Sequence, residues 1–309
     1  MSETLYDLVV IGGGPAGLTA GMYAARARLK TVLIEKVAHG GQTLVADWLE
    51  NYPGFPEGIS GPDLAMKMAA QAEAFGLETL YDEVLAIQPE GLIKEVVLEK
   101  QTLLAKTIII ASGASPKKLG IPGEDKYFGS GVSTCATCDA PFFREKTVVA
   151  IGGGDTAVQE SNYLARFVER VYLVHRRDEL RATKILQERI FANPKVTLVL
   201  DSIPIAILGD DRGVTGVHLS NVKTGEQHHL EADGCFVWIG LTPNASFVRN
   251  TLARNGAGFI QVNEHMETSA PGVFACGDVR VTPLRQVATA VGDAAIAAIG
   301  VEHYLAHHH

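Results

Sequence analysis

Residues 5–35 read LYDLVVIGGGPAGLTAGMYAARARLKTVLIE and decide the fold of this part of the chain. An apolar run at 5–11 leads into the G-x-G-x-x-G pattern at 12–17, an alanine-rich helix to about Arg28, a second strand at 30–34 and an acid, Glu35. Glycines here permit a tight turn and let a pyrophosphate approach the backbone at a helix N-terminus, while the acid binds a ribose hydroxyl. This order of strand, turn, helix, strand and acid predicts a dinucleotide site.

The same unit recurs in the middle of the chain. A strand at 147–151 is followed by Gly152-Gly153-Gly154-Asp155-Thr156-Ala157, a helix to about Phe167 and a strand at 170–174. In place of the acid stand His175, Arg176, Arg177 and then Arg181. Arginines bind a 2′-phosphate through charge-assisted hydrogen bonds, so this repeat indicates NADPH. The alternative is a basic, solvated face on a surface strand.

Between the two repeats lies Cys135-Ala136-Thr137-Cys138, followed by Asp139. Two cysteines at this spacing can alternate between dithiol and disulfide, and Asp139 can carry a proton to or from the departing thiolate. Half of a zinc site is the alternative, but the remaining cysteines, Cys235 and Cys276, are isolated in the sequence. We therefore predict a redox pair and no metal.

Composition narrows the class of protein. The chain has 309 residues, 47% of them hydrophobic, with 32 glycines and a net charge of −8. Its length suggests about two α/β domains, and its acidity argues against a nucleic-acid binder. No apolar run approaches the length of a membrane span, and the start of the chain is a poor signal peptide, so a cytoplasmic location is expected. We assign no function to residues 307–309.

Other segments complete the expected organisation. We expect a helix from about Gly61 to Phe75, short strands over 80–110 laid across the parallel sheet, and further strands over 196–238 with a hairpin turn at 223–226. Proline and glycine mark linkers at 116–123 and 241–244. A strand at 272–278 and a small-residue helix from 285–287 to about Leu305 close the chain.

In this order the motifs resemble those of the low-molecular-weight thioredoxin reductases, in the pyridine nucleotide-disulfide oxidoreductase class. The resemblance covers essentially the whole chain. It rests on GGGPAG at 12–17, GGQ at 40–42, CATCD at 135–139, GGGDTA at 152–157, HRRD at 175–178 with Arg181, ACGD at 275–278 and RQ at 285–286.

The resemblance implies an α/β fold of two Rossmann-like, three-layer ββα dinucleotide-binding domains, the second inserted in the first. Residues 1–115 and 246–309 would bind FAD, and residues 116–245 would bind NADPH and carry the redox pair. The FAD residues would be Gly12, Gly14, Ala16, Gly17, Glu35, Gly41, Gln42, Asn51, Ala111, Gly113, Gly277, Asp278, Arg285, Gln286 and Val287. The NADPH residues would be Gly152, Gly154, Asp155, Thr156, His175, Arg176, Arg177 and Arg181.

The implied activity is NADPH-dependent reduction of thioredoxin or a thioredoxin-like protein by a homodimer. Hydride would pass from NADPH to FAD, and electrons then to a Cys135–Cys138 disulfide, with rotation of the NADPH domain about the two linkers. Cys138 would face the flavin, Cys135 would attack the partner's disulfide and Asp139 would serve as the acid. Ser130 stands where the family often has an arginine that helps to dock thioredoxin.

Two other functions stay open at this point. An enzyme of the same fold would pass electrons to oxygen as a dithiol oxidase, or to another thioredoxin-like or small disulfide partner. A flavoprotein that senses redox state without catalysis would instead hold a metal at the two cysteines. The arginines of the second repeat favour an enzyme that takes electrons from NADPH, because a sensor would have no use for a second nucleotide site.

Overall fold

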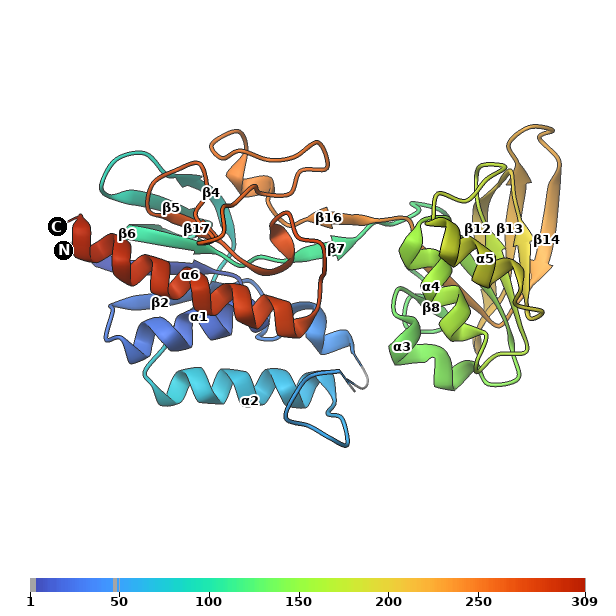
Figure 1. Cartoon of the computed structure of the whole chain (residues 1–309), viewed down its shortest axis with the longest axis horizontal. Coiled ribbons are helices and arrows are strands. Elements are labelled where there is room, and N and C mark those ends of the chain that lie inside the picture. The colour runs from blue at the N-terminus through green and yellow to red at the C-terminus, as the bar shows by residue number, and fades with distance from the viewer. Residues whose placement is uncertain (1–3, 47–48, 50, 309) are drawn as a thin grey trace. The chain divides into compact units, whose positions relative to one another are not determined.

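The computed structural model describes residues 4–46, 49 and 51–308, and the side chains of Val45 and Cys138 also lie outside the description. The chain divides into two compact units (Figure 1). Unit 1 comprises the residues up to Ser115 and those from Thr242 onwards, and unit 2 comprises Pro116–Leu241.

Unit 1 is built on a seven-stranded sheet in the order β3-β2-β1-β6-β5-β4, with β17 also paired to β6. The first three strands in that order, together with β6 and β17, run parallel, whereas β4 and β5 are antiparallel to their neighbours. The strands are β1 (Leu5–Ile11), β2 (Thr31–Glu35), β3 (Glu78–Tyr81), β4 (Val84–Gln88), β5 (Lys94–Leu98), β6 (Thr102–Ile110) and β17 (Val273–Ala275).

Each face of this sheet is covered. The helices α1 (Pro15–Arg26), α2 (Gly61–Ala74) and α6 (Val287–His307) bury one face through side chains such as Leu8, Leu18 and Ala297 (Figure 1). Side chains of β4, β5 and the segment around Phe247 pack on the other face. Short 3₁₀ helices connect these elements, namely η1 (Gly41–Val45), η3 (Ser246–Val248) and η4 (Gly277–Val279).

Unit 2 repeats this layering on a smaller scale. Its five-stranded parallel sheet has the order β11-β10-β9-β15-β8, and a separate antiparallel sheet has the order β12-β13-β14. The strands are β8 (Val132–Ser133), β9 (Thr147–Gly152), β10 (Arg170–Val174), β11 (Val196–Val199), β12 (Ser202–Asp210), β13 (Gly213–Asn221), β14 (Gln227–Glu231) and β15 (Gly234–Trp238).

Helices lie on one face of the parallel sheet of unit 2 and the antiparallel sheet on the other. The helices are α3 (Ala136–Asp139), α4 (Asp155–Leu164) and α5 (Lys184–Phe191), with the 3₁₀ helix η2 (Ala140–Phe143). Leu164 and Ile190 pack with Phe236 on the helical face, whereas Val217 and Leu219 pack with Val149 on the opposite one. The helices, the parallel sheet and the antiparallel sheet therefore form three layers, with the parallel sheet in the middle.

The two connecting segments pair as a short ribbon of β7 (Ala114–Pro116) and β16 (Leu241–Pro243). Asn244 anchors the second crossing, because its side-chain amide donates to the Ser112 carbonyl at 3.0 Å and its carbonyl accepts from the Ser112 hydroxyl at 2.6 Å. Both crossings thus have fixed hydrogen-bond partners at their unit 1 ends.

The predicted α/β class and the hairpin at 223–226 are confirmed, with β13 and β14 on either side of that turn. Helix ends differ by a few residues from the predicted ones. The first helix ends at Arg26 instead of Arg28, because Arg28 has a left-handed φ of 61°. The helix expected to reach Phe167 ends at Leu164.

Candidate functional site

The first glycine turn joins β1 to α1 and approaches β6 closely. Gly12 has a φ of +105°, and a Cβ there would lie 2.6 Å from the Ala111 carbonyl oxygen. A Cβ on Gly17 would lie 1.7 Å from the carbonyl oxygen of Gly12. Only glycine allows this packing of turn, helix and neighbouring strand.

The N-terminus of α1 is open next to this turn. Gly14 caps the helix in an extended conformation with no side-chain hydrogen bond, and a Cβ on it would meet nothing within 4 Å. Gly41 lies beside it, since its Cβ would be 3.4 Å from the Cα of Gly14. Uncapped N–H groups at a helix start suit a pyrophosphate.

Glu35 ends β2, and its carboxylate binds the backbone of the first glycine turn. One carboxylate oxygen accepts the Gly13 N–H at 2.7 Å and the other accepts the Val37 N–H at 2.9 Å. The carboxylate is therefore held in place by the backbone, and its remaining lone pairs can accept from ribose hydroxyls.

Residues from the C-terminal part of unit 1 contact the start of α1 and one another. A Cβ on Gly277 would lie 3.0 Å from the Cβ of Ala16. Asn51 donates to the Gln286 side-chain oxygen at 3.0 Å, although 235 residues separate them in sequence. Arg285 donates from Nε to the Asp278 carbonyl at 3.4 Å. Burial raises the pKa of the Asp278 carboxyl, and the Arg285 charge opposes that effect.

Most residues predicted for the first cofactor thus lie close to at least one other residue of the predicted set or of its glycine turn. The contacts above do not include Gln42, Gly113 and Val287. Gln42 is exposed in η1, and Val287 begins α6. The Gly113 carbonyl accepts the Asn244 N–H at 3.0 Å, so this glycine belongs to the connecting segment as well.

The second turn joins β9 to α4 in the same manner. A Cβ on Gly152 would lie 2.6 Å from the Cβ of Ala157, so alanine fills the position of the last glycine without a gap. Gly154 caps α4 without a side-chain hydrogen bond. Asp155 has a role that the sequence does not suggest: its Oδ1 accepts the Thr183 N–H at 2.7 Å and so holds the start of α5. Thr156 is exposed in the first turn of α4.

His175 is a buried support for this turn. Its ring packs so closely that a Cβ on Gly153 would lie 2.2 Å from Nδ1. Burial lowers the pKa of His175, and Arg181, Arg177 and Arg176 lower it further. The imidazole is therefore neutral near pH 7, and it contributes packing while the arginines carry the charge.

Arg176, Arg177 and Arg181 are exposed around the turn. The Arg181 N–H donates to the Gly153 carbonyl at 2.7 Å, which fastens the arginine segment to the glycines. Among the described residues, no carboxylate forms an ion pair with these three side chains. Their guanidinium groups are consequently available to an anionic ligand.

The redox segment begins at Cys135, which is disulfide-bonded. Its N–H donates to the Ser133 hydroxyl at 3.0 Å, and its sulfur lies 3.3 Å from the Thr137 hydroxyl. The Asp139 N–H donates to the Cys135 carbonyl at 3.3 Å, which closes the turn of α3. Cys138 lies in this turn, but its side chain is outside the described part of the chain.

Sequence reasoning missed Glu160, on α4, which faces this segment. Its carboxylate accepts the backbone N–H of Ala136, the first residue of α3. Burial raises the pKa of the Glu160 carboxyl, and this hydrogen bond lowers it. A contact between segments 24 residues apart leaves no local pattern that would have revealed it.

The other two cysteines are unreactive. Cys235 and Cys276 are buried free thiols. Burial raises the pKa of the Cys235 thiol to about 12 and also raises the pKa of Cys276 well above its usual range. Because thiolate is the nucleophile, both stay inert.

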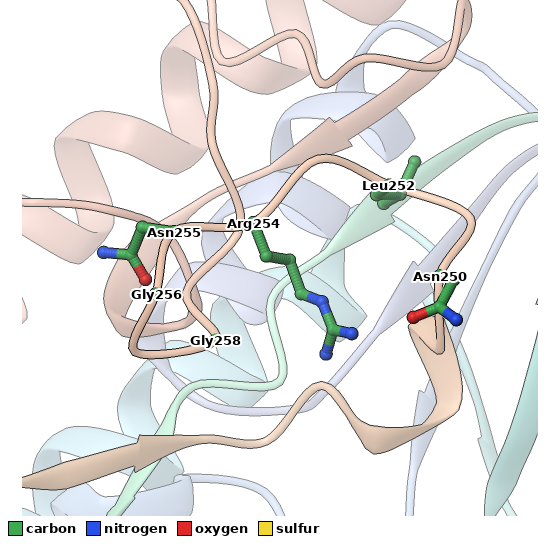
Figure 2. A pocket seen from close by; sticks show the side chains of 6 residues that line it. All are labelled: Asn250, Leu252, Arg254, Asn255, Gly256 and Gly258. Carbon is green, nitrogen blue, oxygen red and sulfur yellow. The ribbon is translucent and has the colours of Figure 1, made fainter.

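A shallow hollow of about 420 Å³ lies on unit 1 (Figure 2). The Arg254 side chain extends between Asn250 and the turn of Asn255, Gly256 and Gly258. None of the predicted site residues lines it.

No group of three or more His, Cys, Asp or Glu side chains among the described residues is arranged to hold a metal ion. No helix that the structure describes combines the length and apolar character needed to cross a membrane.

We predict that Glu160→Gln stabilises the protein at neutral pH. Because the pKa of Glu160 is raised in the folded chain, the folded chain keeps this carboxyl protonated at pH values where the unfolded chain has lost the proton. The free energy of unfolding therefore falls as the pH rises from the pKa of the unfolded chain to that of the folded chain. Glutamine keeps the acceptor but has no charge to bury. Urea unfolding should show a gain at pH 7 that disappears below about pH 4, where the carboxyl is protonated in both states.

The exposed Glu169→Gln serves as the matched control and should show no such pH-dependent gain. A Glu160→Gln variant that is equally or less stable than the wild type at pH 7 would contradict this reading of the site.

Comparisons with known proteins agree with this geometry. The pyridine nucleotide-disulphide oxidoreductase profile matches residues 6–294. A thioredoxin reductase of Peptoclostridium acidaminophilum is 44% identical over 309 residues, covering 98% of both chains. The crystal structure of the Streptococcus pyogenes thioredoxin reductase is 48% identical with a TM-score of 0.83, covering 99% of this chain and 100% of its own.

A ferredoxin-flavin thioredoxin reductase of Clostridium acetobutylicum is also similar, at 32% identity and a TM-score of 0.54, covering 98% of this chain and 99% of its own. The resemblance seen in the motifs is thereby confirmed, as is the two-domain dinucleotide-binding fold. The chain belongs to the pyridine nucleotide-disulphide oxidoreductase family.

Proposed function

We propose that this chain is an NADPH-dependent thioredoxin reductase that binds FAD in unit 1 and NADPH in unit 2. The observation that carries the proposal is the disulfide-bonded Cys135 in the unit that also holds the arginine-flanked glycine turn. The near full-length identity to thioredoxin reductases supports it.

The residues of unit 1 fit FAD. The open helix start at Gly14 suits the pyrophosphate, and the carboxylate of Glu35 suits a ribose. Gly277 and Asp278 would hold the ribityl-phosphate region, and Arg285, Gln286 and Val287 the flavin ring. Bound FAD supplies the two-electron chemistry between NADPH and the disulfide.

In unit 2, Arg176, Arg177 and Arg181 would bind the 2′-phosphate that distinguishes NADPH from NADH. The neutral His175 supports Gly153 below them, and Asp155 holds the Thr183 N–H, so both act by shaping the site. The open helix start at Gly154 would face the pyrophosphate.

The dithiol of Cys135 and Cys138 would reduce the partner by exchange. The Cys135 thiolate attacks one sulfur of the partner's disulfide, and the other sulfur leaves as a thiolate that Asp139 protonates. Cys138 then attacks the Cys135 sulfur, which restores the disulfide of this chain and releases the partner as a dithiol. We assign Cys138 to the face toward the flavin.

We further propose thioredoxin or a thioredoxin-like protein as the partner, a homodimer as the assembly and the cytoplasm as the location. Ser130 stands in place of an arginine, so the surface where the partner would dock lacks that positive charge. A monomeric mass in sedimentation equilibrium would overturn the dimer.

Electron supply distinguishes the alternatives. A ferredoxin-dependent enzyme of this fold, or a dithiol oxidase, needs no 2′-phosphate site. Three guanidinium groups around the second glycine turn form no ion pair within the described part of the chain, and they favour NADPH. A small disulfide in place of thioredoxin remains a second candidate substrate.

The electron path can be followed through the visible absorbance of the flavin. Anaerobic NADPH should bleach the visible absorbance of the flavin, and oxidised thioredoxin should restore it. Cys138→Ser should still be bleached but should not recover, because no disulfide can form. Absorbance at the flavin maximum measures both steps. Absence of bleaching in the wild type would refute NADPH as the donor, and bleaching without recovery would refute thioredoxin as the acceptor.

Arg177→Ala should raise the KM for NADPH by roughly 10- to 100-fold, because a hydrogen bond to a charged group contributes about 1.5–3 kcal/mol. The KM for NADH should stay the same. Arg212→Ala is the control, since Arg212 pairs with Asp210 on a hairpin of the same unit. Initial rates with both nucleotides measure the effect, and an equal loss with NADH would rule out phosphate recognition.

The resemblance also implies that unit 2 rotates about β7 and β16 during turnover. A cross-link that fixes these connections should leave reduction of the flavin by NADPH, or reduction of thioredoxin by the dithiol, but not both in sequence. Multiple turnover should therefore stop, as a coupled thioredoxin assay would measure. Unchanged turnover after complete cross-linking would exclude the rotation.

A further inference from the structure

Phe259 lies directly against a residue of the proposed flavin site. The guanidinium carbon of Arg285 is 4.2 Å from the centroid of the Phe259 ring. Phe259 is only 7% exposed. On another side, Arg285 donates from Nε to the Asp278 carbonyl at 3.4 Å. The guanidinium is therefore held between an aromatic face and a backbone carbonyl.

The ring itself is rigidly mounted. The Asn255 side-chain oxygen accepts the N–H groups of Ala257 and Phe259, each at 3.0 Å, and the Asn255 N–H donates back to the Phe259 carbonyl at 2.9 Å. Figure 2 shows Asn255 at the turn that also contains Gly256 and Gly258. These bonds fix the backbone on which the Phe259 side chain stands.

The next residue joins this turn to the segment after η4. The Ile260 N–H donates to the Val279 carbonyl at 3.1 Å, and the Ile260 carbonyl accepts the Val281 N–H at 2.9 Å. Phe259 and Asp278, the two contacts of Arg285, are consequently parts of one hydrogen-bonded framework.

The local charges make the ring contact effective. Burial lowers the pKa of Arg285, the Asp278 charge raises it and the Arg280 charge lowers it again. Arginine stays protonated in proteins, so a partly desolvated cation lies on the ring. Cation–π attraction is strongest where water is excluded. A long arginine side chain also loses much rotamer freedom when it is fixed, and the ring selects one orientation.

We propose that Phe259 is a positioning residue: its ring holds the Arg285 guanidinium in the orientation that contacts the flavin. The proposal rests on the proposed function, which assigns Arg285 to the flavin ring. It gives the 255–260 turn, which carries none of the recognised motifs, a specific part in cofactor binding.

The test compares Phe259→Met, which keeps apolar volume without a ring, with Phe259→Tyr, which keeps the ring. Phe247→Met is the matched control, because Phe247 is also buried in unit 1 and packs in its apolar core. Flavin fluorescence on dilution of the holoenzyme measures the dissociation constant for FAD, and dye equilibration measures the reduction potential of the flavin.

Phe259→Met should raise the dissociation constant about three- to tenfold, the range expected for loss of a partly buried cation–π contact. It should also move the potential to a more negative value, since a displaced cation stabilises the reduced flavin less. Phe259→Tyr should restore both, and Phe247→Met should change neither. In an Arg285→Met background, Phe259→Met should have no additional effect, because the contact is already lost.

An equal effect of Phe259→Met with and without Arg285 would overturn the positioning role and leave the proposed function standing. Unchanged FAD affinity and potential in Arg285→Met would overturn both the role of Arg285 and that of Phe259. A third outcome is a wild-type enzyme that fails to reduce thioredoxin while the effects of Phe259→Met and Arg285→Met on FAD affinity stay non-additive. That result would overturn the proposed function and support the positioning role.

Discussion

The buried ion pair between Arg280 and Asp293 organises the cofactor end of unit 1. Arg280 Nε lies 2.6 Å from one oxygen of Asp293, and the second oxygen binds the same guanidinium. The first oxygen also accepts the Gly277 N–H at 3.1 Å. Burying both charges costs much of what their attraction gains, so the chief contribution of this pair is geometric. It fixes η4 to α6, and Gly277, Asp278 and the Phe259–Arg285 contact all take their positions from that junction.

In both glycine turns, a side chain from the end of the following strand packs against the middle glycine, but the two side chains differ. Below Gly13 lies the Glu35 carboxylate, and below Gly153 lies the His175 imidazole. The first side chain is an acceptor that binds the turn's N–H and offers negative charge to a ribose. The second is a neutral ring that leaves the charge to three surrounding arginines. The exchange of Glu35 for His175, together with the three arginines around the second turn, thus separates the two proposed nucleotide preferences.

The sequence could predict what depends on local pattern. Strand–glycine–helix order located both turns, and the arginines after β10 were visible because they replace an acid at a known place. It could not predict contacts made by distant residues, such as Asn51 with Gln286 or Phe259 with Arg285, because residues so far apart in the sequence leave no local pattern. Asp155 was assigned to the cofactor from its place in the motif, yet its carboxylate binds the Thr183 N–H. Helix ends shifted by a few residues, since a single left-handed residue such as Arg28 decides them.

The environment of the redox pair follows from the shortness of α3. A helix of four residues has few aligned peptide dipoles, so its macrodipole contributes little at the two cysteines. Neighbouring groups therefore set the chemistry: the Ser133 and Thr137 hydroxyls at Cys135, and the Glu160 carboxylate at the Ala136 N–H. Glu160 lies in the middle of α4, whose N-terminus is capped by Gly154 and would face the proposed NADPH pyrophosphate. One helix consequently begins at the proposed nucleotide turn and contacts the segment that carries the disulfide.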